Sequence, residues 1–344
     1  MKLRDFVLRR IILAIPVVFG VLTITWFLSY IVGDPITMYI TERTPDAAIP
    51  GIRAAHGLDE PVVVQYFLYL TSLFQGDWGL STSTGADKPV LEMLAQLFPA
   101  TIELAIVAMI FAVILGIPLG IISATKKDKV PDHITRIFAL SGVSMPIFWF
   151  GLMLKYVLYF QFSEWGLPFL PGGDRYNLGQ FTYTPTTGFL LVDSLFFEQN
   201  VLLFTDAIKH LVMPGFCLGY ITLAIITRMM RSSMLEVIKE DYITLARSKG
   251  LSERVVIYKH ALRNALIPTV TVIGLAFGGL ITGAVLTETI FNWPGLGRWA
   301  VRAILNADMA AINGFTLLVA FIFVTANFIV DMVYGVLDPR IRFG

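Results

Sequence analysis

Charged residues are scarce in this sequence of 344 residues: they make up 15% of it, whereas hydrophobic residues make up 56%. Soluble domains contain about a quarter charged residues, so the composition argues against a soluble globular protein. The formal net charge of +1 provides no overall positive field for nucleic acid, and none is expected as a partner. The single cysteine, Cys217, excludes an intrachain disulfide.

Sequence signatures of common enzyme classes are absent as well. The chain has no Gly-x-x-x-x-Gly-Lys-Ser/Thr loop with which to bind nucleotide phosphates. It has neither His-Glu-x-x-His nor Gly-x-Ser-x-Gly, the commonest zinc-protease and serine-hydrolase patterns. The four histidines are dispersed and lack the spacing of metal ligands. We therefore expect no catalytic residues, no metal site and no cofactor in this chain.

Long apolar blocks are what the sequence does contain. Crossing about 30 Å of hydrocarbon takes about 20 helical residues, and six blocks reach that length. Helices are expected because backbone polar groups in lipid must be satisfied within the segment. The first block is too long for the apolar region of a signal peptide, which spans about 7–15 residues. The predicted spans are Ile11–Ile31, Ile102–Ala124, Ile137–Phe160, Leu211–Met230, Leu266–Leu286 and Ile312–Val336.

Lysine and arginine predict the orientation of these six transmembrane helices. Most of the 26 basic residues fall near the two termini, in the second-to-third connection and in the fourth-to-fifth connection. By the positive-inside rule these parts face the cytoplasm, so both termini are expected there. The predicted divisions are residues 1–32 (N-terminal segment and first helix), 33–98 (external loop region) and 99–344 (five-helix core, with an external segment at 161–209 and a cytoplasmic loop at 232–265).

Smaller features add local expectations. Val62–Phe74 is predicted to form a short amphipathic helix, and Pro146 is predicted to kink the third span. The apolar patch Gly188–Phe197 is too short to span, so we expect it to lie at the membrane interface or to dock on the bundle. Several tryptophans near block ends are typical of interfacial anchors. These are Trp149, Trp165, Trp293 and Trp299.

The loop between the fourth and fifth spans is the most informative segment. Ser233–Lys249 has a helical pattern in which apolar residues, Tyr242 and Leu245 among them, share one face. Gly250 follows as a helix stop, and a second amphipathic turn at Val255–Leu262 leads into the fifth span. The loop is therefore predicted to be a hairpin on the cytoplasmic face that offers apolar and basic residues to a partner.

Here the sequence resembles the permease subunits of binding-protein-dependent ATP-binding-cassette importers, in the dipeptide, oligopeptide and nickel branch. The resemblance covers nearly the whole chain and is most like dipeptide members. Of the general family pattern Glu-Ala-Ala-x-x-x-Gly, only Ala246 and Gly250 are present, a departure typical of the peptide branch. The matching segments are Gly33–Pro35, Gly188–Phe189, Arg231–Val237, Glu240–Tyr242, Ala246–Leu251, His260–Pro268, Glu288–Phe291, Trp293–Gly297 and Asp338–Arg342.

The resemblance implies a type I importer with alternating access, in which the hairpin is a coupling helix held by an ATPase subunit. It also implies a second, similar permease, two ATP-binding subunits that hold ATP and Mg, and an extracytoplasmic solute-binding protein. Localisation in the cell (inner) membrane follows. The external region 33–98 would contact the binding protein or cap the pore, or else only cover the bundle. The residues expected in the coupling loop are Glu240, Asp241, Tyr242, Ala246, Arg247, Lys249, Gly250 and Leu251.

Ionisable residues in the predicted spans are costly in lipid and therefore tend to face protein or water. Glu103 and Glu288, near outer ends, are expected to act as structural caps or pairs, or to line the outer mouth. Lys155 is expected to snorkel, to pair with a carboxylate or to line the pore, and Asp331 to form a structural pair.

The predicted function is half of a pore that moves dipeptides or short oligopeptides into the cell. The same architecture could carry nickel chelate, glutathione or oligosaccharide. A membrane enzyme or a stand-alone channel is the remaining alternative, and it predicts activity without any ATPase.

Overall fold

The computed structural model describes residues 3–40, 43–83, 87–167 and 170–337. Within these ranges the chain is mostly helical, and five helices are long and apolar enough to cross a membrane. A sixth span is present if the bent pair Val130–Ser144 and Ile147–Glu164 counts as one. The all-α membrane fold predicted from the apolar blocks is confirmed. The basic residues Lys2, Arg340 and Arg342, and the side chain of Asp331, lie outside what is described.

The helices are joined by short turns except in two longer segments, one before residue 90 and one before residue 201. The α-helices are α1 (Leu3–Phe27), α2 (Ile49–Ala55), α3 (Val62–Gln75), α4 (Val90–Thr125), α5 (Val130–Ser144), α6 (Ile147–Lys155), α7 (Phe162–Glu164), α8 (Leu190–Val192), α9 (Val201–Val237), α10 (Asp241–Ser248), α11 (Glu253–Val255), α12 (Leu262–Ile290), α13 (Leu296–Leu305) and α14 (Met309–Leu337). Two short strands, β1 (Leu80–Ser81) and β2 (Lys88–Pro89), pair antiparallel.

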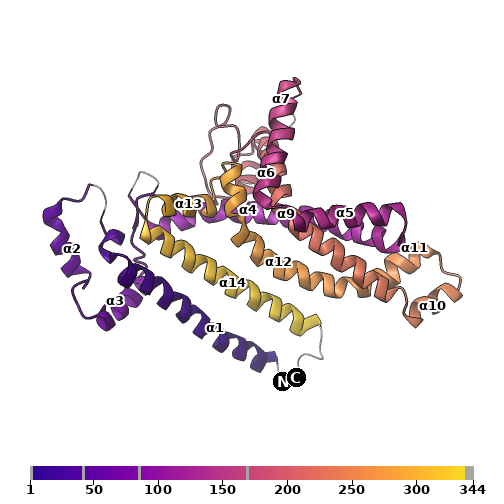
Figure 1. The fold of residues 1–344 in the computed structure, drawn as a ribbon, viewed down its shortest axis with the longest axis horizontal. Helices are drawn as coiled ribbons and strands as arrows, with labels where there is room; N and C mark the ends of the chain where they lie inside the picture. The colour runs from indigo at the N-terminus through magenta and orange to yellow at the C-terminus, as the bar shows by residue number, and fades with distance from the viewer. Residues whose placement is uncertain (1–2, 41–42, 84–86, 168–169, 338–344) are drawn as a thin grey trace.

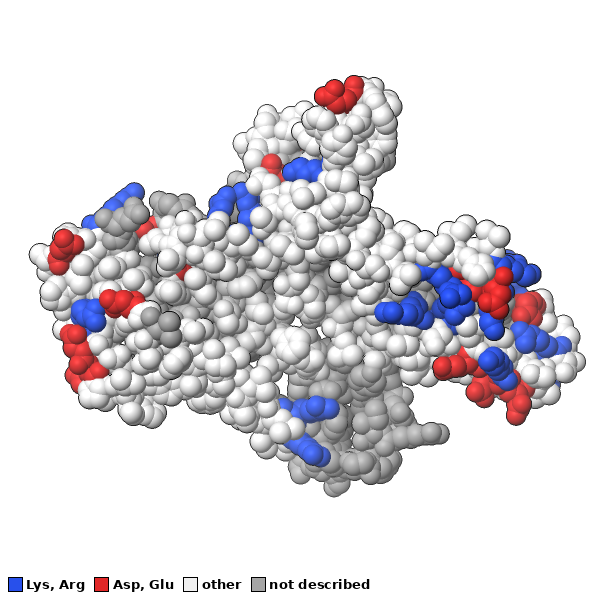
Figure 2. All heavy atoms as spheres, in the orientation of Figure 1, with Lys and Arg blue, Asp and Glu red and all other residues white. Residues whose placement is uncertain are grey.

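The long helices form a bundle along the longest dimension of the molecule. α9 packs against α4, α5 and α12, while α14 lies between α12 and α1 (Figure 1). The α10–α11 hairpin is at one end of the bundle, and α2 and α3 are at the opposite end (Figure 1). Basic and acidic side chains gather over the hairpin end, whereas the broad middle of the same face is nearly without them (Figure 2). This charge distribution is typical of a protein whose middle lies in lipid.

Small residues let α4 and α9 approach closely. A Cβ atom added to Gly120 would lie 2.8 Å from the carbonyl oxygen of Thr227, and one added to Gly219 would meet the backbone of Ala108. The Thr227 hydroxyl also donates to the carbonyl oxygen of Gly116, at 3.3 Å. Tight packing of this kind holds helices together in lipid, where the hydrophobic effect gives no drive for helix association. α4 and α9 therefore form the rigid centre of the bundle.

The third predicted span is sharply bent, and this corrects the expectation of one kinked helix over Ile137–Phe160. α5 ends at Ser144 and α6 begins at Ile147, and the chain bends by 110° between the two segments. Proline disfavours the helical conformation in the residue before it, and Met145 is extended, with φ −83° and ψ 132°. Pro146 therefore breaks the helix, and α6 runs in a different direction from α5 while it packs against α9 and α12 (Figure 1).

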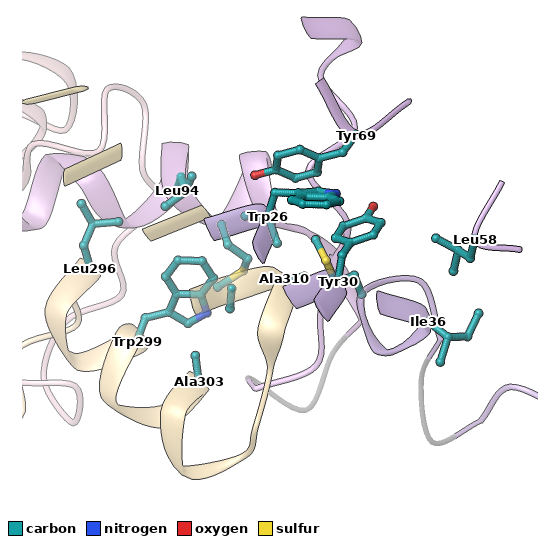
Figure 3. Packing of buried hydrophobic residues seen from close by; sticks show 14 residues of the cluster. Trp26, Tyr30, Ile36, Leu58, Tyr69, Leu94, Leu296, Trp299, Ala303 and Ala310 are labelled. Atoms are coloured by element: carbon teal, nitrogen blue, oxygen red, sulfur yellow. The ribbon is translucent and has the colours of Figure 1, made fainter. Parts of the chain in front are cut away.

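The region after α1 packs against the C-terminal end of α1, the N-terminal ends of α4 and α14, and α13. The predicted amphipathic helix is confirmed as α3, and its Tyr69 packs with Trp26 and Tyr30 of the first span (Figure 3). The Thr25 and Tyr69 hydroxyls are hydrogen bonded at 3.1 Å. Trp299 lies in the same cluster and is buried, so it is not the interfacial anchor that its position near a block end predicted. An aromatic core therefore fixes this outer region to the bundle.

Candidate functional site

The hairpin between α9 and α12 consists of two helical arms joined by a tight turn. The first arm is α10, and the second arm is residues 253–261, which begin with α11 and lead into α12. The structure does not contain the continuous helix predicted for Ser233–Lys249, because α9 ends at Val237 and α10 begins at Asp241. Glu240, between them, has an extended backbone with ψ 146°, which ends one helix and starts the next. The interruption separates the hairpin from the span, so α10 is a short helix of its own.

One face of α10 is packed against the bundle. Ile243 and Ala246 are buried against Met230 and Met234 of α9 and Val256 of the second arm. The residues predicted to share one apolar face lie on two sides of the hairpin: Ala246 is buried, whereas Tyr242 and Leu245 are exposed. Burial of the opposite face leaves these two apolar side chains at the surface, where they are available to a partner.

The turn after α10 has the geometry of a Schellman motif. Gly250 has φ +76°, its N–H donates to the carbonyl oxygen of Arg247 at 2.9 Å, and the N–H of Leu251 donates to that of Ala246 at 3.4 Å. Glycine adopts this left-handed conformation without the steric cost that a side chain adds. The helix stop predicted at Gly250 is confirmed, and the turn fixes the angle between the two arms.

Two polar contacts brace the arms. Arg247 forms a bidentate ion pair with Glu253, at 2.7 and 3.1 Å, and donation of these hydrogen bonds to the Glu253 carboxylate raises the pKa of the Arg247 guanidinium. Asn264 at the start of α12 donates to the Tyr242 hydroxyl at 2.7 Å. Both contacts are exposed, so each is expected to contribute little stability but to orient the side chains involved.

The structure exposes most of the predicted coupling residues on one hairpin. These are Glu240, Asp241, Tyr242, Arg247, Lys249, Gly250 and Leu251, whereas Ala246 is buried. Three exposed apolar residues were not in the predicted set: Leu245, Val255 and Tyr258. Their exposure depends on which face packs inward, and the amphipathic pattern alone did not fix that choice. Whether the hairpin binds an ATPase stays a prediction.

A buried ion pair anchors the base of the hairpin to the α4–α5 turn. Arg231 of α9 donates from Nε and Nη2 to the two carboxylate oxygens of Asp132, both at 2.9 Å. Ser123 of α4 donates to the same carboxylate at 2.5 Å, and so does the backbone N–H of Asp128, at 2.9 Å. Three helices therefore meet at Asp132, which the sequence gave no reason to single out.

At the end of α12 that lies away from the hairpin, Glu288 fixes the turn after α12 to α4. Its carboxylate is fully buried and accepts hydrogen bonds from the Thr101 hydroxyl at 2.7 Å and the backbone N–H of Arg298 at 3.0 Å. A Cβ atom on Gly295 would collide with that carboxylate, which accounts for a glycine at this turn. Trp293 is also buried and donates to the carbonyl oxygen of Ala100 at 2.9 Å, so it is not an interfacial anchor. This surrounding favours the structural alternative for Glu288.

The other two candidate lining residues also contact protein. Glu103 forms a buried ion pair with Arg175 at 2.6 Å, and Arg175 lies 5.7 Å from the ring centroid of Trp293. Lys155 donates to the carbonyl oxygen of Ile290 at 3.1 Å, at the end of α12. A role of Glu103, Lys155 or Glu288 in lining the pore or its mouth stays a prediction. Within the described residues, no group of three or more His, Cys, Asp or Glu side chains is placed to hold a metal ion.

The apolar patch Gly188–Phe197 contacts the bundle through Leu190, which packs with Leu203 and Ala207 of α9, and Asp193 of the same patch organises the loop before it. This carboxylate accepts hydrogen bonds from the hydroxyls of Thr187 and Tyr183, both at 2.6 Å, and from the backbone N–H groups of Thr186, Thr187 and Gly188. Burial alone would raise the pKa of Asp193, but these donors outweigh it and lower the pKa to about 2. The ionised carboxylate thus closes the loop.

Acidification is expected to open this loop. Because the folded pKa is lowered, the stabilisation of on the order of 2 kcal/mol is complete above about pH 4 and is lost as the pH falls toward 2. Limited proteolysis with pepsin should therefore cleave the segment 181–200 at pH 2 and spare it at pH 4, after correction with a free peptide of that sequence. Asp193→Asn should be cleaved at both pH values, whereas Glu198→Gln, which removes the charge of an exposed carboxylate that accepts one hydrogen bond, should behave as wild type. Equal protection of Asp193→Asn and wild type would contradict the role given to Asp193.

The sequence of this chain is similar to those of known membrane transport proteins. The family "Binding-protein-dependent transport system inner membrane component" matches residues 116–343, and a second family, "Binding-prot-dependent transport system membrane comp, N-term", matches residues 3–105. The probable D,D-dipeptide transport system permease protein DdpB of Escherichia coli K12 is 45% identical over 329 residues, 95% of this chain and 94% of that protein. The dipeptide transport system permease protein DppB of the same organism is 44% identical over 341 residues, 98% of each chain.

A more distant relative is the oligopeptide transport system permease protein AppB of Bacillus subtilis, 35% identical over 339 residues, 98% of this chain and 99% of that protein. The likeness therefore runs over the full bundle, the segments that join its helices and the hairpin. The chain belongs to the family of inner membrane components of binding-protein-dependent transport systems, as a multi-pass permease subunit.

Proposed function

We propose that this chain forms half of the membrane pathway of an ATP-driven importer for dipeptides or short oligopeptides. The observation that carries the proposal is the α10 hairpin: a short helix, seated on α9 and α12, that presents exposed Tyr242 and Leu245 at the charged end of the bundle. The peptide cargo is supported by the relatives, which are permeases for dipeptides and oligopeptides.

Motion of the hairpin would be carried into the bundle by the contacts that seat it. Ile243 packs against α9 and the second arm, and the Asp132–Arg231 pair joins the base of the hairpin to α4 and α5. A displacement of α10 by ATP-driven closure of two partner subunits would thus move several spans together. Rigid-body movement of this kind is one general route to alternating access in transporters.

The proposal includes a membrane orientation and a set of partners. The basic residues near the hairpin favour a cytoplasmic position for it and for both termini. Two ATP-binding subunits, holding ATP and Mg, would then dock at the hairpin end. A second permease would complete the pathway, and an extracytoplasmic solute-binding protein would deliver peptide at the end that carries α2, α3 and α13.

Uptake by the reconstituted complex tests this function. We expect proteoliposomes that contain this chain, its partner permease, both ATPases and the binding protein to accumulate a labelled dipeptide with ATP and not with a non-hydrolysable analogue. Omission of the ATPases should abolish uptake. Accumulation of nickel chelate, glutathione or oligosaccharide in place of dipeptide would show a different cargo, and ATP-independent conductance would overturn the importer.

A further inference from the structure

A cavity of about 500 Å³ lies between α5 and α9, close to the hairpin end of the bundle. α5 is fastened to α9 at two places on either side of it. Near the start of α5, Asp132 binds Arg231, and near its end the Ser141 and Tyr220 hydroxyls are hydrogen bonded at 2.7 Å. These two attachments fix both ends of α5 to α9, so the cavity between them is bounded by fixed parts of the bundle.

The lining of the cavity is divided between apolar and cationic side chains. Ile137 and Leu140 are exposed members of the apolar side, so the cavity reaches the outer surface of α5. A ligand that fits must therefore combine an anionic group with an apolar part. The apolar lining consists of Ile137, Ala139, Leu140 and Ala224, and the polar lining of Ser123, His133, Thr135, Arg136, Thr227, Arg228, Arg231 and Ser232.

The positive charge of the cavity is not balanced within the described part of the chain. Both oxygens of Asp132 are occupied by Arg231 and by donors from Ser123 and Asp128, so this acid compensates Arg231 alone. Arg136 and Arg228 form no ion pair in the residues that the structure describes. Two guanidinium groups at the rim of a partly apolar cavity thus call for an external anion.

The position of the cavity indicates where such an anion comes from. It lies beside the turn 126–129, which carries three lysines, at the end of the spans that the positive-inside rule assigns to the inner membrane surface. Next to it, α5 exposes Ile134, Ile137 and Leu140, as expected of a lipid-facing helix. Basic pockets between transmembrane helices on this side are suited to the phosphates of anionic lipids.

We propose that this cavity binds an anionic phospholipid, with its phosphate at Arg136 and Arg228 and an acyl chain along Ile137 and Leu140. Arginine suits this role because its planar guanidinium donates two parallel hydrogen bonds to phosphate oxygens. The lipid would fill the space between α5 and α9 and fasten the middle of α5 to the centre of the bundle. This proposed lipid site is separate from the recognition of peptide, and the proposal does not depend on which cargo the transporter carries.

Native mass spectrometry of the assembled, detergent-solubilised transporter tests the site by titration with phosphatidylglycerol and, in parallel, with zwitterionic phosphatidylcholine. We expect wild type to retain phosphatidylglycerol in preference to phosphatidylcholine. Replacement of either Arg136 or Arg228 alone by glutamine should weaken the binding of phosphatidylglycerol about fivefold, and the double variant Arg136→Gln/Arg228→Gln should weaken it about 30-fold. The conservative pair Arg136→Lys/Arg228→Lys, which keeps both charges, should retain most of the preference and shows that a loss is not due to misfolding.

Arg254→Gln is the matched control, because it removes one charge at the same end of the molecule from an exposed residue outside the cavity lining. It should bind phosphatidylglycerol as wild type does. The lipid assignment is overturned if millimolar inorganic phosphate or a dipeptide displaces phosphatidylglycerol, or if the double glutamine variant retains it fully. Since the readout is lipid retention, its failure would leave peptide uptake, measured separately, unaffected.

Discussion

Gly250→Asp is expected to reduce peptide uptake by at least about tenfold and to remove the stimulation of ATP hydrolysis by peptide-loaded binding protein. A Cβ atom at this position would meet nothing within 4 Å, so the substitution causes no clash inside the chain. Its internal cost is limited to the left-handed backbone, φ +76°, which disfavours a side chain by about 1 kcal/mol. A loss of function much larger than this must come from the proposed ATPase contact.

Gly166→Asp is the matched control for that experiment. Gly166 has φ +70° and likewise nothing within 4 Å of an added Cβ, but it follows α7, away from the hairpin. The two variants share their backbone cost and their new charge, and they differ in location. We expect Gly166→Asp to transport at close to the wild-type rate. Wild-type stimulation of ATP hydrolysis in Gly250→Asp would contradict the coupling role of the hairpin.

The membrane fold could be predicted because it depends on properties that are local in sequence. Apolar blocks of sufficient length located the spans, although α4 and α9 extend well beyond the predicted blocks, into residues 90–101 and 201–210. The turn at Gly250 was predictable for the same reason, since a glycine after a basic last turn stops a helix by backbone conformation alone. Pro146 signalled a distortion, but the size of the bend depends on how α6 packs.

The pairing of charges could not be predicted, because it depends on contacts between residues far apart in the chain. Glu103 and Arg175 are separated by 72 residues, and Asp132 and Arg231 by 99. The cost of an ionisable group in a span shows that a partner is needed but does not identify it. Trp293 and Trp299 illustrate the same limit. In the sequence, a tryptophan near the end of a span is compatible both with a membrane interface and with a buried position, and only the packing shows that these two are buried.

Glu103→Gln is expected to destabilise the bundle by about 3–5 kcal/mol, which would lower the melting temperature of the purified chain by roughly 10 °C. The reason is the position of Arg175, whose side chain is 9% exposed, against 5% for that of Glu103. Its Nη2 atom donates to Glu103 at 2.6 Å and to the carbonyl oxygen of Gly188 at 3.0 Å. Glutamine removes the countercharge and leaves the guanidinium buried among dipoles and the ring of Trp293.

Two further variants separate this effect from a general sensitivity of α4. Glu92→Gln makes the same change in the same helix, but Glu92 is exposed and lies 3.5 Å from Lys88, so a loss below about 1 kcal/mol is expected. In Glu103→Leu/Arg175→Met both charges are replaced by apolar groups of similar size, which should recover most of the stability because no buried charge remains uncompensated. If Glu103→Gln melted within about 1 °C of wild type, or the double variant were no better than the single one, the buried pair would not be the contact that fixes the segment around Arg175 to α4.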